Sequence, residues 1–243
     1  MSTESIESGF LSIFALFTFF IFLLVNKLSN KYLYKSLLDN DFDKPQAFHR
    51  EAITRSGGVA IFISLIFFLY INNILFEKIL FEYFLVGLSV FIIGFVDDLK
   101  IKIQAKTRLF FMIASLIILI FIFNIEIERI DLFFLNTLME NQLFSIFFVL
   151  LCFLFIINGA NLIDGFNGLL TINLIIINII LTYININNEN LEFSILLISQ
   201  IIILFSFLLF NFPGAKIFLG DSGAYTMGAL IGLNTIITNN LNP

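Results

Sequence analysis

The chain has 243 residues, of which 59% are hydrophobic, and its formal net charge is −5. A mean hydropathy of +1.02 excludes an ordinary soluble globular domain, because so much apolar surface could not be hidden from water. Runs of about 18 or more apolar residues are typical of membrane-spanning helices, so we expect an all-α polytopic membrane protein. The single cysteine, Cys152, lies inside such a run and cannot form an intrachain disulfide.

The hydropathy pattern predicts about eight membrane spans, which we treat as one integral membrane domain over residues 1–243. The N-terminal run follows two glutamates and no basic residue. A cleaved signal peptide has a basic leader, so we interpret this run as a retained span. The predicted spans are residues 8–26, 57–76, 79–96, 108–125, 142–158, 169–185, 193–211 and 223–239.

The loops between the predicted spans alternate in charge. Lysine and arginine gather in the first, third and seventh loops, whereas glutamate and aspartate dominate the second, fourth and sixth. Because basic loops stay in the cytoplasm, we expect both termini on the outer side. The predicted cytoplasmic loops, which are to hold the active site, are residues 27–56, 97–107, 158–168 and 212–222.

Acidic residues from three of these loops lie at cytoplasmic ends of spans, while no charged residue lies near the middle of any span. This pattern predicts a site at the boundary between membrane and water. A transporter more often carries polar groups near the midplane, and Asn124, Asn173 and Asn178 are the only hints of such a track. Hydrogen bonding between helices is the simpler interpretation of Asn173 and Asn178. The acidic residues are Asp97, Asp98, Asp164 and Asp221.

The segment 158–168 reads N-G-A-N-L-I-D-G-F-N-G and separates two apolar runs. Its amides and carboxylate would each cost several kcal/mol in hydrocarbon, so it must lie at the membrane surface or line a wet cavity. Its glycines let the backbone turn tightly and approach a ligand. Asn161 and Asp164 supply the hard oxygen atoms that Mg²⁺ prefers.

The pair Asp97 and Asp98 directly follows an apolar run, and Arg108 comes ten residues after Asp98. Adjacent side chains on a helix point about 100° apart. One carboxylate can therefore face a metal or substrate while the other orients a basic neighbour. The alternative is a helix end that reaches water and forms local ion pairs.

The segment 211–223 reads N-F-P-G-A-K-I-F-L-G-D-S-G, and its proline and glycine predict a loop before the last span. A helix N-terminus offers free N–H groups that favour phosphate, so Asp221 beside it suggests a metal held against phosphate. Lys216 could meet a phosphate, and Phe218 could stack on a base. The alternative for G-D-S-G is an ordinary helix cap.

The segment 49–58 reads H-R-E-A-I-T-R-S-G-G. Arginine forks fit phosphate oxygens, which makes Arg55 a candidate phosphate-binding residue. For Arg50 we prefer the simpler interpretation that it is one of the basic residues that keep a loop in the cytoplasm. His49 is the only histidine, so it cannot belong to a histidine-rich metal site.

Together these segments resemble the polyprenyl-phosphate N-acetylhexosamine-1-phosphate transferases. The motifs stand in the family's order: His49 with R-S-G-G, Asp97-Asp98 with Arg108-Leu109, and then residues 158–168 and 211–223. The family includes the enzymes that begin peptidoglycan, O-antigen, enterobacterial common antigen and teichoic acid linkage units. The resemblance implies transfer of a sugar 1-phosphate from a UDP-sugar to a polyprenyl (undecaprenyl) phosphate in the bacterial cytoplasmic membrane, with release of UMP.

The resemblance also implies roles for individual residues. Mg²⁺, or Mn²⁺ in its place, would be held by Asp221 with Asn161 as second ligand. The catalytic residues would be Asp97, Asp98 and Asp221, the first two near the lipid phosphate, and uracil would lie at Asn211 and Phe218. The substrate-binding residues would be Asn158, Asp164, Gly165, Asn211, Phe218, Arg55 and Arg108. We expect no nucleic-acid partner and leave a homodimer open.

Departures from the family pattern bear on substrate and completeness. Prolines usual near Ala52 and Thr54 are absent, and Asn167 replaces the aspartate of the peptidoglycan enzymes. Arg108-Leu109 is more like the UDP-N-acetylglucosamine branch. The chain ends before the family's last spans and a histidine-containing loop, so we expect UMP binding with Mg²⁺ but poor turnover, and an uncovered face on the last helix. A flippase for an anionic lipid-linked substrate and a truncated inactive member remain alternatives.

Overall fold

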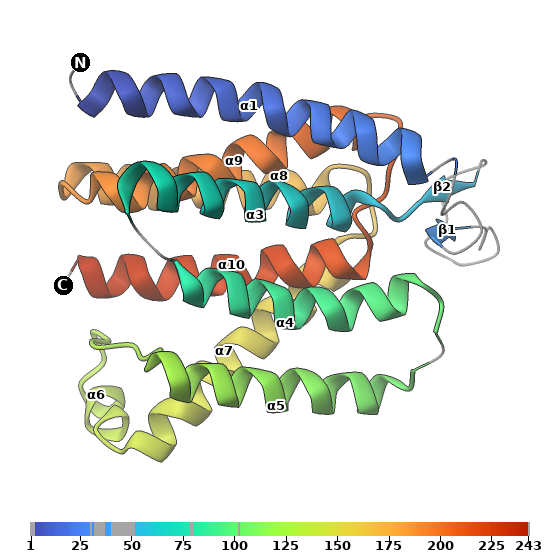
Figure 1. The fold of residues 1–243 in the computed structure, drawn as a ribbon. Helices are drawn as coiled ribbons and strands as arrows, with labels where there is room; N and C mark the ends of the chain where they lie inside the picture. The colour runs from blue at the N-terminus through green and yellow to red at the C-terminus, as the bar shows by residue number, and fades with distance from the viewer. Residues whose placement is uncertain are drawn as a thin grey trace.

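The computed structural model describes residues 3–29, 31, 37–39, 52–77, 80–101 and 103–242. Within these ranges, eight long helices lie at the eight predicted positions, which confirms the all-α class (Figure 1). Among the residues singled out in the sequence, His49 and Arg50 lie outside the described residues. The long helices are α1 (Thr3–Leu28), α3 (Gly57–Phe76), α4 (Phe81–Asp98), α5 (Ala105–Phe123), α7 (Gln142–Ile163), α8 (Leu169–Asn187), α9 (Leu191–Asn211) and α10 (Gly220–Leu241).

Short elements that the hydropathy pattern could not predict join these helices. Helix α6 (Phe133–Met139) lies between α5 and α7, and strands β1 (Leu38–Asp39) and β2 (Ile53–Thr54) form an antiparallel pair. Thr54 also bridges to Ile217 in the loop before α10. Residues far apart in the sequence are thereby joined beside the start of α10.

Helix α10 lies at the centre of the bundle rather than on its surface. It packs against α4 and α7, and also against α3 and α8, and most of its side chains are buried. The prediction that the last helix leaves a face uncovered is therefore wrong. The reason lies in its composition: serine, threonine, glycine and asparagine suit close contact with other helices better than contact with lipid.

Six of the long helices in the described residues are long and apolar enough to cross a membrane: α1 over Gly9–Leu28, α3, α5, α7, α8 and α9. The other two predicted spans correspond to α4 and α10, which are of similar length. Helix α4 carries three acidic residues, and α10 is the least apolar of the long helices. Both can lie in the bundle because neighbouring helices cover them.

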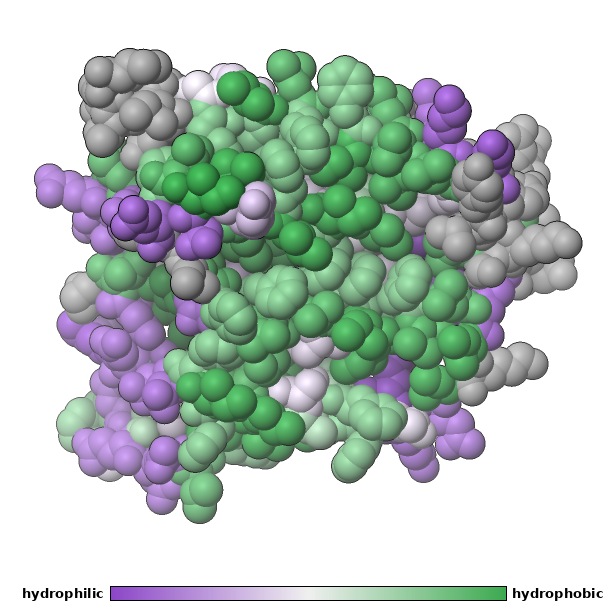
Figure 2. Space-filling view, in the orientation of Figure 1, coloured by the Kyte–Doolittle hydropathy of each residue, from purple (hydrophilic) through white to green (hydrophobic). Residues whose placement is uncertain are grey.

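The two ends of the bundle are polar and its middle is apolar, as Figure 2 shows for one face. The start of α1 and the end of α10 lie at one end, whereas the loops that follow α4 and α9 lie at the other (Figure 1). Large hydrophobic side chains are exposed along the sides of the bundle. This is the arrangement of a multi-pass membrane protein.

Four buried polar side chains from four helices bond to one another inside the bundle. Tyr83 donates to Asn234 Oδ1 at 2.9 Å, and Asn234 Nδ2 donates to Gln200 Oε1 at 2.8 Å and to Asn178 Oδ1 at 3.1 Å. All four residues have no exposed surface. The interhelical role expected for Asn178 is confirmed, whereas Asn173 donates to Leu169 O in its own helix.

The last turn of α10 is bonded to the segment that follows α5. Asn240 Nδ2 donates to Glu126 O at 2.8 Å, and the backbone N–H of Glu128 donates to Asn240 Oδ1 at 3.1 Å. Asn239 donates to Arg129 O at 3.0 Å. These amides stabilise the end of the bundle opposite to the loops that follow α4 and α9 (Figure 1).

The predicted orientation can be tested by cysteine labelling of intact cells. In a Cys152→Ser background, Leu162→Cys lies at the end of the bundle that carries the loops after α4 and α9, and Glu189→Cys lies at the opposite end; Leu162 is 83% exposed. An impermeant maleimide should label position 189 but reach position 162 only after permeabilisation. Efficient labelling of position 162 in intact cells would reverse the orientation given by the loop charges.

Candidate functional site

The carboxylate of Asp98, at the end of α4, caps the start of α10. Asp98 Oδ1 accepts the backbone N–H of Asp221 at 2.9 Å, and Oδ2 accepts the backbone N–H of Ser222 at 3.0 Å. The Ser222 hydroxyl donates to Oδ2 at 2.6 Å. Because Asp98 is fully buried, its carboxylate serves as an interhelical cap that satisfies two N–H groups at the start of α10.

Two glycines allow this close approach of α4 and α10. Gly220 has φ = 75°, and a Cβ at this position would lie 2.6 Å from Asp98 Oδ2. A Cβ at Gly94, one turn before the end of α4, would lie 2.5 Å from the backbone nitrogen of Ser222. Side chains at either position would push the two helices apart.

The capping contact corrects one expectation about phosphate. The sequence suggested that free N–H groups at the start of the last helix would bind phosphate, but those of Asp221 and Ser222 are occupied by Asp98. A protein carboxylate therefore fills the place that a helix N-terminus offers to an anion.

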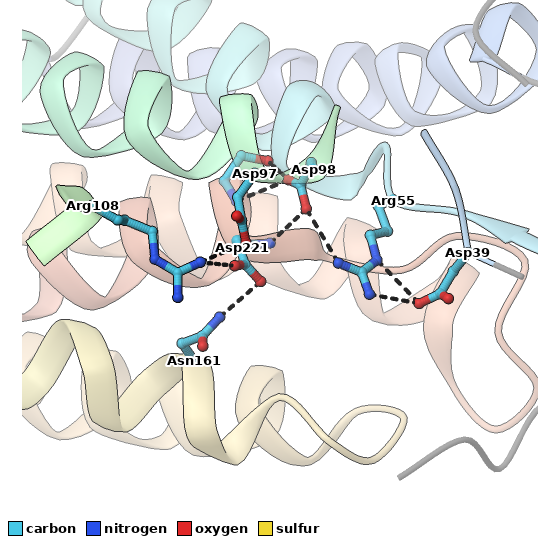
Figure 3. A network of polar contacts seen from close by, with 8 residues as sticks. Asp39, Arg55, Asp97, Asp98, Arg108, Asn161 and Asp221 are labelled. Carbon is cyan, nitrogen blue, oxygen red and sulfur yellow. Dashed lines mark hydrogen bonds and ion pairs between the residues drawn. The ribbon is translucent and has the colours of Figure 1, made fainter. Parts of the chain in front are cut away.

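The second carboxylate of the pair faces a different set of partners. Arg108 Nη1, in the first turn of α5, donates to Asp97 Oδ2 at 2.5 Å and to Asp221 Oδ2 at 3.1 Å. Asn161 Nδ2, near the end of α7, donates to Asp221 Oδ1 at 3.0 Å. Figure 3 shows Asp221 with Arg108 on one side, Asn161 below it and the adjacent pair Asp97 and Asp98 above it. Four helices thus bring their charged and amide groups to one point.

Burial disfavours the charged forms of both adjacent carboxylates. It raises the pKa of Asp97 to about 6, and the neighbouring Asp221 carboxylate adds to this rise while Arg108 opposes it. Burial also raises the pKa of Asp98 to about 7, against the hydrogen bonds donated by Ser222. The donors around Asp98, which are the backbone N–H groups of Asp221 and Ser222 and the Ser222 hydroxyl, stabilise its ionised form and so oppose part of this rise in pKa.

Arg55 connects this centre to the β1–β2 hairpin. Its Nη2 donates to Asp39 Oδ2 at 2.7 Å, and its Nη1 lies 3.9 Å from Asp98 Oδ1 (Figure 3). The three hydroxyls of Ser29, Thr54 and Ser56 are buried beside it and bonded to one another. The pairing with Asp39 had no signal in the sequence.

Two loops predicted to bind substrate are tied together by side-chain amides. Asn211 Oδ1 accepts the backbone N–H of Gly168 at 2.6 Å, and Asn211 Nδ2 donates to Ile217 O at 3.0 Å. Asn167 donates to Pro213 O at 3.1 Å. In this structure the buried Asn211 holds the loops, and its part in uracil binding stays a prediction.

The remaining predicted site residues, Asp164, Gly165, Phe218 and Asn158, lie on α7, in the loop after it and in the loop before α10. The half-buried Asp164 follows α7, and burial raises its pKa, with further contributions from the charges of Asp221 and Asp98. Gly165 is exposed, and Phe218 is half-buried beside the bridge of Thr54 and Ile217. Asn158 donates to Leu154 O in its own helix.

One residue of the site was missed although the sequence contained a signal for it. Ser222 belongs to the G-D-S-G segment, and serine is favoured at helix starts, where its hydroxyl bonds neighbouring groups. The G-D-S-G pattern suggested a metal at Asp221 or an ordinary helix cap, and neither interpretation gave Ser222 a partner on another helix. The partner of Ser222, however, is a carboxylate 124 positions away, which only the packing of α4 on α10 determines.

The residues of the network suit a hard divalent cation. Carboxylate oxygens of Asp97 and Asp221 both contact one nitrogen of the Arg108 guanidinium. The two carboxylates therefore already bind one cationic group. Among the described residues no group of three acidic, histidine or cysteine side chains is placed to hold a metal. Two carboxylates fit Mg²⁺, which usually keeps several waters and takes further oxygens from substrate phosphates.

Fold and site together define a multi-pass α-helical membrane protein with a carboxylate and guanidinium centre at one end of its bundle. The family model described as Glycosyl transferase family 4 matches residues 80–239, which include the helices α4 to α9 and all of α10 except its last two residues. The chain belongs to this family.

Named relatives include two kinds of transferase. A phospho-N-acetylmuramoyl-pentapeptide-transferase of Prochlorococcus marinus is 33% identical over 249 positions, covering 96% of this chain and 69% of the relative. An undecaprenyl-phosphate alpha-N-acetylglucosaminyl 1-phosphate transferase of Thermotoga maritima is 28% identical over 190 positions, covering 78% and 53%. A phospho-N-acetylmuramoyl-pentapeptide-transferase of Sulfurimonas denitrificans is 34% identical over 173 positions, covering 60% and 49%. The chain thus spans about half to two thirds of their lengths.

Proposed function

We propose that this chain carries the active site of a transferase that moves a sugar 1-phosphate from a UDP-sugar to a polyprenyl phosphate and releases UMP. The observation that carries the proposal is the junction of Asp97, Arg108, Asn161 and Asp221 at one end of an apolar bundle. Membership of the family and the names of its relatives support the same activity. The centre lies where a water-soluble donor and a lipid acceptor can meet.

In the proposed reaction an oxygen of the acceptor phosphate forms a bond to the β-phosphorus of the donor. The bond from that phosphorus to the bridging oxygen breaks, and UMP leaves with the bridging oxygen. Arg108 and Arg55 supply positive charge for phosphate oxygens, which is the main requirement in phosphoryl transfer. Asp97 is not required as a base, because a phosphate monoester is already largely ionised near pH 7.

We further propose that the activity depends on Mg²⁺, held by Asp221 with Asp97 beside it. When bound, the ion would neutralise charge on the diphosphate of the donor. Asn161 presents its N–H to Asp221 in this structure, so it orients that carboxylate. A half-turn of the amide about its last torsion would present the oxygen that a second ligand requires.

Exposed apolar residues border the centre and support a lipid acceptor. Leu109 on α5 is 43% exposed, Leu162 on α7 is 83% exposed, and Phe166 in the loop after α7 is 58% exposed. Contact of large apolar side chains with lipid chains is favourable in free energy, whereas their exposure to water is unfavourable. A prenyl chain approaching between α5 and α7 would bring its phosphate to Arg108.

The proposal also covers the type of donor sugar and the pathway in which the transferase acts. Arg108-Leu109 and Asn167 favour an N-acetylglucosamine type of donor, whereas relatives of both types match the chain. The first step of a cell-envelope polysaccharide at the bacterial cytoplasmic membrane is the process that fits either donor.

The test is transfer of label from a radioactive UDP-sugar into the lipid phase. Membranes containing the protein are incubated with undecaprenyl phosphate, each UDP-N-acetylhexosamine and Mg²⁺, and matched membranes lacking it serve as control. Label in the lipid phase together with UMP release supports the proposal. Absence of both, with the protein folded, would favour the flippase or the inactive member.

A further inference from the structure

One nitrogen atom holds two carboxylates of the centre together. Arg108 Nη1 donates to Oδ2 of Asp97 and to Oδ2 of Asp221, at 2.5 and 3.1 Å. The three residues come from α5, α4 and α10 (Figure 3). The two carboxylates belong to elements whose positions are fixed by packing, since Asp97 adjoins the buried cap Asp98 and Asp221 begins α10.

The bridging guanidinium compensates a local excess of negative charge. Two carboxylates this close repel each other unless a cation lies between them. Arg108 supplies the cation, and its guanidinium also lies 5.8 Å from the centroid of the Tyr225 ring. A quarter of the Arg108 side chain is exposed, and its long stem lies in the first turn of the peripheral helix α5, so the guanidinium can leave without moving the backbone.

We propose that Arg108 is an internal counter-cation that a divalent cation displaces, and that the released guanidinium then binds phosphate oxygens of the donor. The second half rests on the proposed function. Mg²⁺ binds carboxylate oxygens at about 2.0–2.1 Å, so an ion on both Oδ2 atoms would overlap the volume that Nη1 fills. Arg108 and the ion therefore compete for the carboxylates.

Once displaced from the carboxylates, the Arg108 guanidinium can bind the phosphate groups of the donor. Its fork of N–H groups matches two oxygens of a phosphate, and a donor diphosphate bound at the ion would lie within reach of the guanidinium. Metal and donor would thus bind in a linked manner. The ion frees the arginine, and the arginine then contributes to holding the donor.

The experiment measures Mn²⁺ binding by electron paramagnetic resonance of the free ion, with purified full-length protein in nanodiscs and no nucleotide. Arg108→Gln should bind Mn²⁺ about tenfold more tightly than wild type, because a positive charge within about 4 Å of the ion is removed. Arg108→Lys should stay closer to wild type. Arg129→Gln is the matched control, since Arg129 is exposed at the opposite end of the bundle.

Thermal melting gives a second measurement on the same samples. Without metal, Arg108→Gln should melt below wild type, because the two carboxylates are left uncompensated, and Mn²⁺ should raise its melting temperature by more than that of wild type. A purely structural ion pair would lower the melting temperature but leave the Mn²⁺ affinity unchanged or weaker. That result overturns the proposal, as does absence of Mn²⁺ binding to Arg108→Gln.

The outcomes separate this inference from the proposed function. Transfer of label into lipid with equal Mn²⁺ affinities would leave the transferase in place and remove the competition. Tighter Mn²⁺ binding by Arg108→Gln without any transfer of label by wild type would establish the competition and remove the transferase.

Discussion

Asp221→Asn is expected to abolish transfer of labelled sugar phosphate into lipid while leaving the fold intact. The substitution keeps the volume and the contact with Asn161 but removes one of the two charges that converge on Arg108. Loss of a single charge-stabilising group at a transition state costs about 10²- to 10³-fold in rate, and loss of the metal would add to this. The rate is to be measured by UMP release at limiting Mg²⁺.

A matched control for this variant is Asp131→Asn. Asp131 is 90% exposed and pairs with Arg129 at the opposite end of the bundle, so its substitution should change neither rate nor melting temperature. Wild-type turnover by Asp221→Asn at limiting Mg²⁺ would show that the metal is held elsewhere or is not used.

Asp98→Asn is expected to lower stability and activity together. An asparagine can accept hydrogen bonds only through Oδ1, so its NH₂ group would face the Ser222 donors that now bond to Oδ2. Breaking a buried charged network of this kind costs on the order of 3 kcal/mol. The start of α10 would then shift and carry Asp221 with it. Melting of the protein in nanodiscs and label transfer measure the two effects.

The comparison with Asp97→Asn distinguishes the two adjacent carboxylates. The Asp97 side chain is 27% exposed and contacts Arg108, so its substitution should reduce activity with a much smaller change in melting temperature. If Asp98→Asn instead melted like wild type while activity was lost, Asp98 would act on the substrate and the capping role would be secondary.

Much of the fold follows from hydrophobic runs, because each run that must cross a bilayer forms a helix and satisfies its own backbone. The residues Asp97, Asn161 and Asp221 could be placed at one end because basic loops alternate along the chain, although they lie in the end turns of α4, α7 and α10, where loops were predicted. The central position of α10 was not predicted. Its low hydropathy and small residues were visible, but only contacts with α4 and α7 show that it is enclosed.

The separate roles of Asp97 and Asp98 show what could not be predicted about the site from the sequence. In sequence they are neighbouring residues of one type, and helical geometry indicates only that they point in different directions. Which one faces α10 depends on how α4 is rotated in the bundle, and that is determined by close contacts such as the one at Gly94. The role of Asp39 depends likewise on the hairpin that brings it to Arg55.

Helix α10 is held along its axis at three heights, and this separates a stationary part of the centre from a movable one. Asp98 holds its first turn, Asn234 bonds to three other helices in its interior, and Asn240 anchors its last turn. A slide by one residue, about 1.5 Å, would break contacts at all three heights at once. The Asp221 carboxylate is therefore a fixed reference point relative to the bilayer. Arg108, on a helix at the edge of the bundle, can change position without disturbing it.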